Sequence, residues 1–166
     1  LSFERSSHPG LRFTAYYDAS LPDIEADRDK LHQVFLNLVR NASEACPADG
    51  RVRVLTRHCA HWELAGTNLD PTRRYILVSI EDEGPGIPEE LRKNIFKPLF
   101  STKKQGTGLG LSISFRLVES HGGQLRYQPS ERSGACFQVI LPESQSEPLE
   151  ENSPNFVYQD LRKEIS

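Results

Sequence analysis

Apolar residues recur along the chain with two different periods, one typical of strands and one typical of helices. Strand formers and two-residue alternation predict strands at 12–17 and 51–59, and an unbroken apolar run predicts a buried strand at 75–80. Apolar residues spaced by three and four predict a helix that Asp27 caps and that ends at about Ala45. The stripe that this helix would bury consists of Leu31, Val34, Phe35, Leu38, Ala42 and Ala45.

The second half of the chain predicts a short helix, a long helix and a closing hairpin. The short helix is expected at 89–94, and the long one at 109–121, where Gly122-Gly123 stops it. Strands at 124–128 and 135–141 would form the hairpin. Because strands and helices mix without a regular strand–helix–strand rhythm, we predict an α+β fold in which helices cover one face of a mixed sheet.

Three other segments carry weaker patterns. A short strand is expected through Ile24, and residues 61–74 are expected to form a polar loop. Residues 143–166 are rich in Glu, Ser, Pro and Asn, which is typical of a flexible or linker-like segment, although 156–165 could form a terminal helix. We therefore predict one domain at 1–142, followed by a polar, flexible tail.

The composition limits the partners of the chain. With 20 Lys and Arg against 23 Asp and Glu, the net charge is −3, so we expect no broad attraction to nucleic acid or to a membrane. No apolar run reaches the roughly 18–20 residues that span a bilayer, and the N-terminus lacks the order of a signal peptide. Three cysteines without CxxC spacing favour a reduced, cytoplasmic compartment over zinc or a disulfide scaffold. Since Met is absent, we expect a piece of a longer protein.

The first candidate site lies on the helix that Asp27 caps. Asn37 and Asn41 are four residues apart and therefore lie on one helix face, with Glu44 beyond them. An Asn carbonyl oxygen can ligate a hard cation such as Mg²⁺, which takes one or two protein oxygens and the phosphates of a nucleotide. The alternative is that the two Asn residues are solvated or cap the helix.

Two glycine-rich segments form the second and third candidates. Asp82-Glu83-Gly84-Pro85-Gly86-Ile87 follows the apolar strand, where a carboxylate could accept a hydrogen bond from an amino group such as adenine N6 and glycines allow close approach. Gly106-Thr107-Gly108-Leu109-Gly110-Leu111 precedes a long helix, whose free N–H groups favour phosphate. It matches neither the P-loop nor the dinucleotide pattern. The alternatives are an ordinary tight turn and a flexible loop.

Between these segments lies a basic, hydroxyl-bearing stretch with aromatic anchors, Phe96 to Gln105. It predicts a lid at 97–106 that orders when Lys or Thr side chains reach phosphates. The alternative is an exposed loop that carries two lysines.

The order of these segments closely resembles that in the catalytic, ATP-binding domain of bacterial sensor histidine kinases. This domain belongs to a wider superfamily that also includes gyrase and MutL. Residues 33–45 resemble the N box of the family, 82–87 its first glycine box, 96–100 its F box and 106–111 its second glycine box. The likeness covers about 11–142, and the short lid is most similar to the nitrogen-regulator subgroup.

The resemblance implies the Bergerat fold, a two-layer α/β sandwich that holds ATP between helices and sheet. It implies Mg²⁺ on Asn37 and Asn41, adenine on Asp82, and Asn37 and Lys103 as catalytic residues. The nucleotide-binding residues that it implies are Asn37, Asn41, Asp82, Gly84, Gly86, Ile87, Phe96, Phe100, Thr102, Lys103, Gly106, Thr107, Gly108, Leu109, Gly110 and Leu111.

One position departs from the family pattern. Many of these kinases carry a basic residue three positions after the second Asn, where this chain has Glu44. Phosphate contacts are therefore expected from Arg40, Lys103 or Lys104.

No histidine of the chain stands in the helical His-Glu/Asp-x-x-x-Pro setting of the family's phosphate acceptor. The five candidates are His8, His32, His58, His61 and His121. We therefore expect the acceptor on a dimerisation domain N-terminal to Leu1, with relay to a response regulator and no contact of this fragment with nucleic acid or membrane.

Two alternatives to a histidine kinase remain open. In ATP hydrolases of the superfamily, a Glu that activates water stands at the position of Asn37, and an amide has no basic site for that role. A non-catalytic module that only binds nucleotide is the other alternative.

Overall fold

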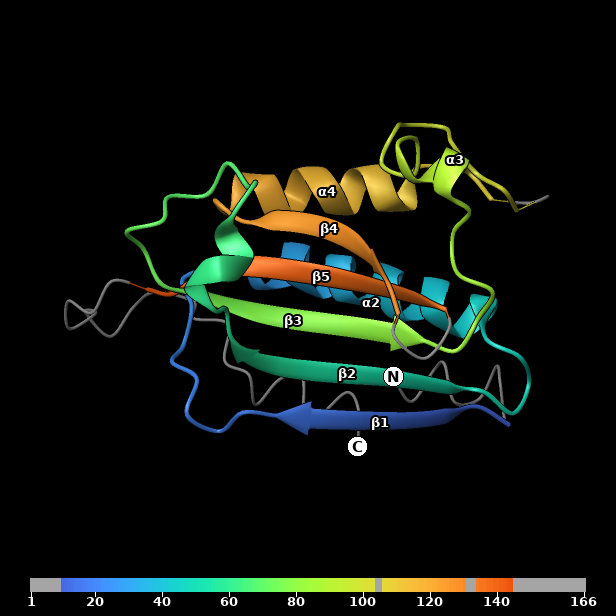
Figure 1. The fold of residues 1–166 in the computed structure, drawn as a ribbon, viewed down its shortest axis with the longest axis horizontal. Helices are drawn as coiled ribbons and strands as arrows, with labels where there is room; N and C mark the ends of the chain where they lie inside the picture. The colour runs from blue at the N-terminus through green and yellow to red at the C-terminus, as the bar shows by residue number, and fades with distance from the viewer. Residues whose placement is uncertain (1–9, 104–105, 131–133, 145–166) are drawn as a thin grey trace.

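The strands of the protein form one mixed, five-stranded sheet in the computed structural model (Figure 1). The structure describes residues 10–103, 106–130 and 134–144. β1 runs parallel to β2, and the other neighbouring strands are antiparallel, so the predicted mixed sheet is confirmed. In spatial order the strands are β1 (Arg12–Tyr17), β2 (Arg51–His58), β3 (Tyr75–Asp82), β5 (Ala135–Pro142) and β4 (Gln124–Pro129).

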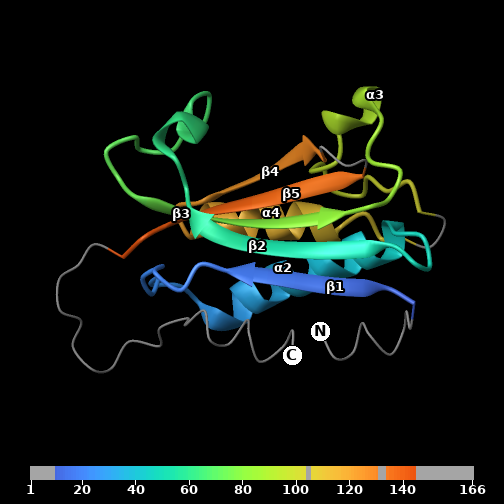
Figure 2. The ribbon, with the colours of Figure 1, turned by 60° about the horizontal axis from the view of Figure 1, so that its bottom comes forward.

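Both long helices, α2 (Arg28–Ala45) and α4 (Gly110–Ser120), lie side by side on one face of the sheet (Figure 2). This arrangement confirms the predicted two-layer α+β sandwich. α2 begins after Asp27, whose Oδ1 accepts a hydrogen bond from Lys30 N at 3.1 Å, as the cap pattern predicts.

The hydrophobic core lies between the helices and the sheet. The apolar stripe of α2 is buried as predicted except at Ala45, which is half-buried because the helix ends there. Every residue of β3 except Glu81 is buried, as expected for an unbroken apolar strand with neighbours on both sides. Aromatic rings pack at one end of the core, where the Phe96 ring centroid lies 5.3 Å from that of Phe115 and 6.5 Å from that of Phe137.

His121 joins the end of α4 to the beginning of α2. The backbone N–H of Asp27 donates to His121 Nε2 at 3.0 Å, so this nitrogen carries no proton. The other nitrogen, Nδ1, must then donate its hydrogen to the Leu117 carbonyl oxygen 2.7 Å away. His121 therefore links the end of α4 to the beginning of α2 through both of its ring nitrogens.

Some element boundaries differ from those predicted. β3 continues through Asp82, and the short helix α3 (Glu89–Arg92) ends before residue 94. Ile24 forms an isolated bridge instead of a strand. The tail from 145 on lies outside the described residues, so its flexibility, its terminal helix and the domain boundary at 142 stay predictions. Among the described helices, none has the length and apolar character needed to cross a bilayer.

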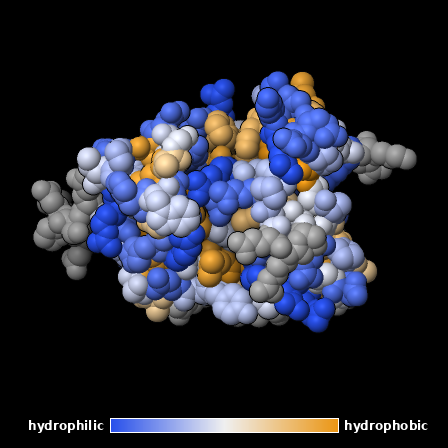
Figure 3. Space-filling model, in the orientation of Figure 1, coloured by the Kyte–Doolittle hydropathy of each residue, from blue (hydrophilic) through white to orange (hydrophobic). Residues whose placement is uncertain are grey.

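The segment at 61–74, predicted to be a polar loop, contains a short 3-10 helix, η1 (His61–Leu64), that packs on the sheet face opposite the long helices (Figure 1). Leu64 forms a second small core there with Tyr75, Leu77 and Ile140. The surface on this side of the molecule is mostly hydrophilic, with smaller hydrophobic patches near the middle and at the upper edge of the view (Figure 3). η1 therefore covers apolar residues of the sheet that α2 and α4 cannot reach.

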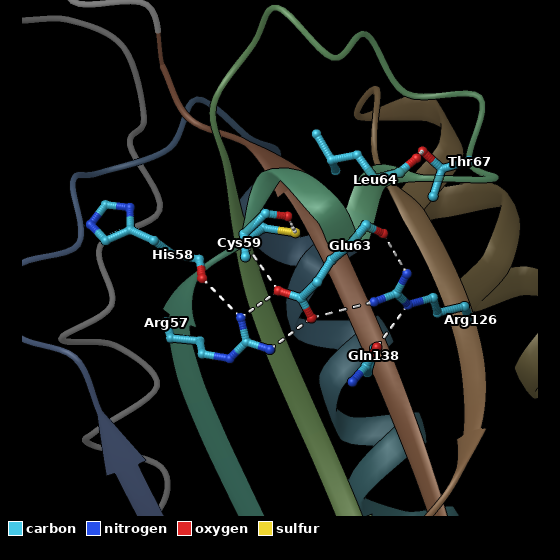
Figure 4. Close-up of polar contacts among 9 residues, drawn as sticks. Arg57, His58, Cys59, Glu63, Leu64, Thr67, Arg126 and Gln138 are labelled. Atoms are coloured by element: carbon cyan, nitrogen blue, oxygen red, sulfur yellow. Dashed lines mark hydrogen bonds and ion pairs between the residues drawn. The ribbon is translucent and has the colours of Figure 1, made fainter.

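A buried ionic cluster fixes η1 to the sheet (Figure 4). The Glu63 carboxylate accepts hydrogen bonds from Arg57 Nη1 at 2.6 Å and Nη2 at 2.8 Å, and Arg126 Nη2 lies 3.6 Å away. Arg126 also donates from Nη1 to the Glu63 carbonyl oxygen and from Nε to Gln138 Oε1. The hydrogen bonds from Arg57 are the main reason why the pKa of Glu63 is lowered.

Replacing Glu63 by Gln keeps the shape of the side chain and removes the charge that the two arginines neutralise. We expect the free energy of unfolding at pH 7 to fall by about 1–3 kcal/mol, because a buried donor loses its charged partner. A lowered carboxyl pKa contributes stability above the unfolded value and loses it as the pH falls through the folded value. The difference in stability from wild type should therefore be complete at pH 7 and shrink as the pH falls below 4.5, the ordinary pKa of a glutamate side chain.

Urea unfolding at pH 7 and at pH 4 measures both effects. Glu119→Gln changes the net charge equally at an exposed residue of α4 and should leave stability nearly unchanged. Equal stability of E63Q and wild type at pH 7 would mean that the cluster does not hold η1.

Candidate functional site

A cavity of about 670 Å³ lies between α2, the end of β3, the segment before α3, the lid and the beginning of α4. Residues from all four sequence segments that resemble the family boxes reach its wall. The predicted nucleotide-binding residues that line it are Asn37, Asn41, Asp82, Gly86, Ile87, Phe100, Thr102, Lys103, Gly106, Thr107, Gly108, Gly110 and Leu111.

Three predicted site residues lie next to the cavity without lining it. Phe96 belongs to the aromatic cluster of the core. Gly84 packs so closely under the end of α2 that a Cβ there would lie 2.7 Å from the Ala45 carbonyl oxygen. Leu109 is the N-cap residue of α4 and is 38% exposed. These positions shape the cavity from behind or from its edge.

The wall also contains residues that were not among the predicted nucleotide-binding residues. They are mostly apolar and come from α2, from both sides of α3 and from β5: Ala45, Pro85, Pro88, Leu91, Ile95, Ala135 and Phe137. Leu91 and Ile95 are four residues apart, a helical spacing that could have indicated them. Ala135 and Phe137 carried no such signal, because β5 reaches the cavity only through its pairing with β3.

Asn37 lies where α2 and the first turn of α4 come together. Its Nδ2 donates to Ser114 Oγ at 2.9 Å, which fixes the orientation of the amide. A Cβ on Gly110 would lie 2.3 Å from Asn37 Oδ1, so only glycine lets the helix backbone approach this oxygen so closely. The Asn37 carbonyl oxygen therefore lies beside the N-terminus of α4, where anionic ligands are favoured.

Asn41 and Glu44, one and two turns further along α2, contact the lid. Lys103 Nζ donates to Asn41 Oδ1 at 3.1 Å and also forms an ion pair with Glu44 Oε2. Glu44 Oε1 accepts from Arg40 Nε at 2.9 Å. Of the three basic residues that were predicted to contact phosphates, Arg40 and Lys103 line the cavity. Lys104 lies outside the described residues.

Asp82 lies at the buried wall of the cavity and is 1% exposed. Its Oδ1 accepts hydrogen bonds from Gly84 N at 2.9 Å and Ala135 N at 3.1 Å. Burial is the main cause that raises the pKa of Asp82, and the two backbone hydrogen bonds oppose it only in part. The protein therefore holds a carboxylate in an environment that disfavours its charge, a feature more common at binding sites than in ordinary cores.

The lid and the second glycine segment are packed against each other. A Cβ on Gly108, which has φ +68°, would lie 2.4 Å from the Leu99 carbonyl carbon. Leu99 itself has φ +65°, unusual for a residue with a side chain, and is 77% exposed. This close backbone contact fixes where the lid leaves the cavity wall, next to Phe100.

Comparison with known proteins gives a consistent result. Residues 26–145 match the family model described as histidine kinase-, DNA gyrase B-, and HSP90-like ATPase. The sensory histidine kinase/phosphatase NtrB of Azospirillum brasilense is 40% identical over 134 residues, 80% of this chain and 33% of that protein. Sporulation kinase C of Bacillus subtilis is 39% identical over 119 residues, 72% of this chain and 25% of that protein.

Solved structures agree with these sequence relatives. The catalytic domain of the histidine kinase ThkA is 33% identical with a TM-score of 0.69, over 86% of this chain and 84% of that one. The mycobacterial sensor histidine kinase MprB is 27% identical with a TM-score of 0.68, over 85% of this chain and 87% of that one.

Replacing Asp82 by Asn tests whether the site is built at the expense of stability. The variant keeps an oxygen for Gly84 N and Ala135 N but removes the buried charge. Because a raised carboxyl pKa makes stability fall as the pH rises above the unfolded value of 3.8, the variant should gain on wild type over this range. We expect D82N to be at least as stable as wild type at pH 7.

Thermal unfolding at pH 4 and pH 7 measures the difference in stability between D82N and wild type. A loss of more than about 1 kcal/mol in D82N at pH 7 would mean that the hydrogen bonds of the carboxylate outweigh its desolvation.

Proposed function

Because this chain belongs to the histidine kinase-, DNA gyrase B- and HSP90-like ATPases, as a catalytic domain of the sensor histidine kinase type, we propose that it presents the γ-phosphate of Mg-ATP to a histidine on another domain. The chain spans about a third of the NtrB relatives that it matches. The acceptor histidine is therefore proposed to lie on a dimerisation domain of the same protein, and a response regulator is the proposed final recipient.

Adenine binding is proposed for the buried end of the cavity. Asp82 is anchored there through Oδ1 by two backbone N–H groups. A carboxylate in this position can accept a hydrogen bond from the exocyclic amino group of adenine and rejects bases that present an acceptor instead. The apolar wall formed by Ile87, Leu91 and Phe137 suits the faces of an aromatic base.

Asn37 and Asn41 suit Mg²⁺, which prefers hard oxygen ligands and keeps several waters. Both residues line the cavity, and their carbonyl oxygens add no charge to a site that must also accept phosphates. The described residues contain no cluster of three or more His, Cys, Asp or Glu that could hold a metal by itself. The phosphates of the nucleotide would supply the remaining ligands, and the ion would reduce the negative charge at the γ-phosphate.

The observation that carries the kinase proposal is the amide at position 37. Asn37 cannot take a proton from water, and its orientation is fixed by Ser114. The carboxylate closest along α2 is that of Glu44. Partial burial alone would raise its pKa, but hydrogen bonds from Lys103 and Arg40 outweigh that effect and lower the pKa, which makes Glu44 a weak base. The site is thus suited to hold phosphates for an external nucleophile.

The residues of the chain would contribute mainly by positioning. The N-terminus of α4 and the glycines before it offer backbone N–H groups to phosphate oxygens. Lys103 and Arg40 offer positive charge at the mouth of the cavity. A docked histidine nitrogen would then attack the γ-phosphorus in line, and ADP would leave with the bridging oxygen.

Two substitutions separate the proposed adenine and metal roles. Asp82→Asn should weaken Mg-ATP binding by about 10-fold or more, because the amide can turn its own donor toward the donor on adenine. Asn37→Asp should weaken it less, because the carboxylate still offers oxygen to the metal. Isothermal titration calorimetry of both variants measures the two losses, and equal losses would show that the roles are wrongly assigned.

Phosphotransfer itself is tested with ATP that is radiolabelled at the γ-phosphate. The chain alone should neither label itself nor release phosphate at an appreciable rate, since no histidine of its sequence stands in an acceptor setting and position 37 carries an amide instead of a water-activating Glu. Adding a dimerisation domain that carries the acceptor histidine should yield acid-labile phosphohistidine on that domain. Acid-stable label on the chain, or rapid phosphate release without a partner, would favour the hydrolase branch of the family instead.

A further inference from the structure

Glu44 occupies an unusual position at the mouth of the cavity, where it binds two cations at once. Its Oε1 accepts from Arg40 Nε at 2.9 Å, and its Oε2 pairs with Lys103 Nζ. Arg40 and Glu44 lie on α2, whereas Lys103 belongs to the lid. All three side chains line the cavity. Glu44 is thus an anion of the protein placed where the two basic side chains proposed to contact phosphates converge.

Lys103 links this anion to the proposed metal site. The same ammonium group that pairs with Glu44 donates to Asn41 Oδ1 at 3.1 Å. An ammonium group that donates to Asn41 Oδ1 would lie close to a cation bound by the same oxygen, and the repulsion between the two positive charges disfavours this arrangement. A metal ion at Asn41 would therefore favour departure of Lys103, and a phosphate group could then pair with its charge.

The ion pair is weak enough to be exchanged. The side chains of Lys103 and Glu44 are 44% and 32% exposed, and partly exposed pairs of this kind contribute little net stability. A terminal phosphate carries more charge than a carboxylate and offers more acceptor oxygens. Exchange of Lys103 from Glu44 to phosphate is thus feasible, but every nucleotide that recruits Lys103 has to break the contact with Glu44 first.

We propose that Glu44 is a positioning and specificity-determining residue, an internal competitor of the γ-phosphate that holds Lys103 over Asn41 and thereby weakens triphosphate binding more than diphosphate binding. This inference rests on the proposed function. Glu44 acts through Lys103. The ion pair between them keeps the lid attached to α2 until nucleotide and metal together draw Lys103 away from Glu44. The result is a site in which ATP and ADP exchange more readily than the basic residues alone would allow.

The test compares Mg-ATP and Mg-ADP affinities of wild type, Glu44→Gln, Lys103→Met and the double variant by isothermal titration calorimetry. E44Q should bind Mg-ATP about 2- to 5-fold more tightly, the range expected for release of a partly exposed ion pair, and should gain less for Mg-ADP. In the Lys103→Met background the same substitution should have little effect, because the competition for Lys103 has been removed and the remaining pair of Glu44 with Arg40, whose side chain is 68% exposed, contributes little. Glu119→Gln, with the same change in charge on exposed α4 surface, should leave both affinities unchanged.

A second readout follows the lid directly. Without nucleotide, peptides that cover residues 97–103 should exchange amide hydrogen faster in E44Q than in wild type, because one contact to α2 is lost. A change in the ATP-to-ADP affinity ratio that persists in the Lys103→Met background would assign the effect to simple charge repulsion and overturn the proposal. Unchanged or weaker Mg-ATP binding by E44Q would overturn it too. Absence of Mg-ATP binding by wild type would instead contradict the proposed function itself.

Discussion

The structure depends on one constraint: two amphipathic helices have to bury their apolar stripes on the same face of a single sheet. They can lie side by side there only if the polar groups between them find partners. Asn37 in the middle of α2 pairs with Ser114 near the beginning of α4, and Asp27 before α2 pairs with His121 at the end of α4. These two contacts link the helices along the length of α4 and leave the last turns of α2 to line the cavity.

Two buried carboxylates have pKa values that are shifted in opposite directions, one in the fold and one at the proposed adenine site. Glu63 is neutralised by Arg57 and approached by Arg126, and its pKa is lowered, so its charge stabilises the fold. In the described part of the chain the Asp82 carboxylate is held by two backbone N–H groups instead of an arginine, and burial raises its pKa. The Glu63 carboxylate attaches η1 to the sheet face opposite the long helices. The Asp82 carboxylate lies at the buried wall of the cavity.

The side chains at the mouth of the cavity are held less firmly than those at its buried end. At the buried end, backbone groups and apolar side chains fix Asp82 in one arrangement. At the mouth, contacts between Lys103, Asn41 and Glu44 involve partly exposed side chains that exchange partners at little cost. If the proposed roles hold, a rigid adenine site beside an exchangeable phosphate site would suit a domain that binds, positions and releases a nucleotide in each cycle.

The sequence by itself determined the two long helices, the five strands of the sheet and most of the cavity wall, but it missed η1. Apolar periods identified both long helices and the strands, and the glycine and asparagine segments identified residues that line the cavity from α2, β3, the lid and α4. These signals are local, since a helical stripe or a glycine before a helix can be recognised from a few neighbouring residues. The tertiary structure alone decided which groups meet across the chain. Glu63 pairs with Arg126, Lys103 reaches Glu44, and Phe137 joins the wall because sheet pairing and helix packing bring distant segments together, and no periodic pattern encodes such contacts.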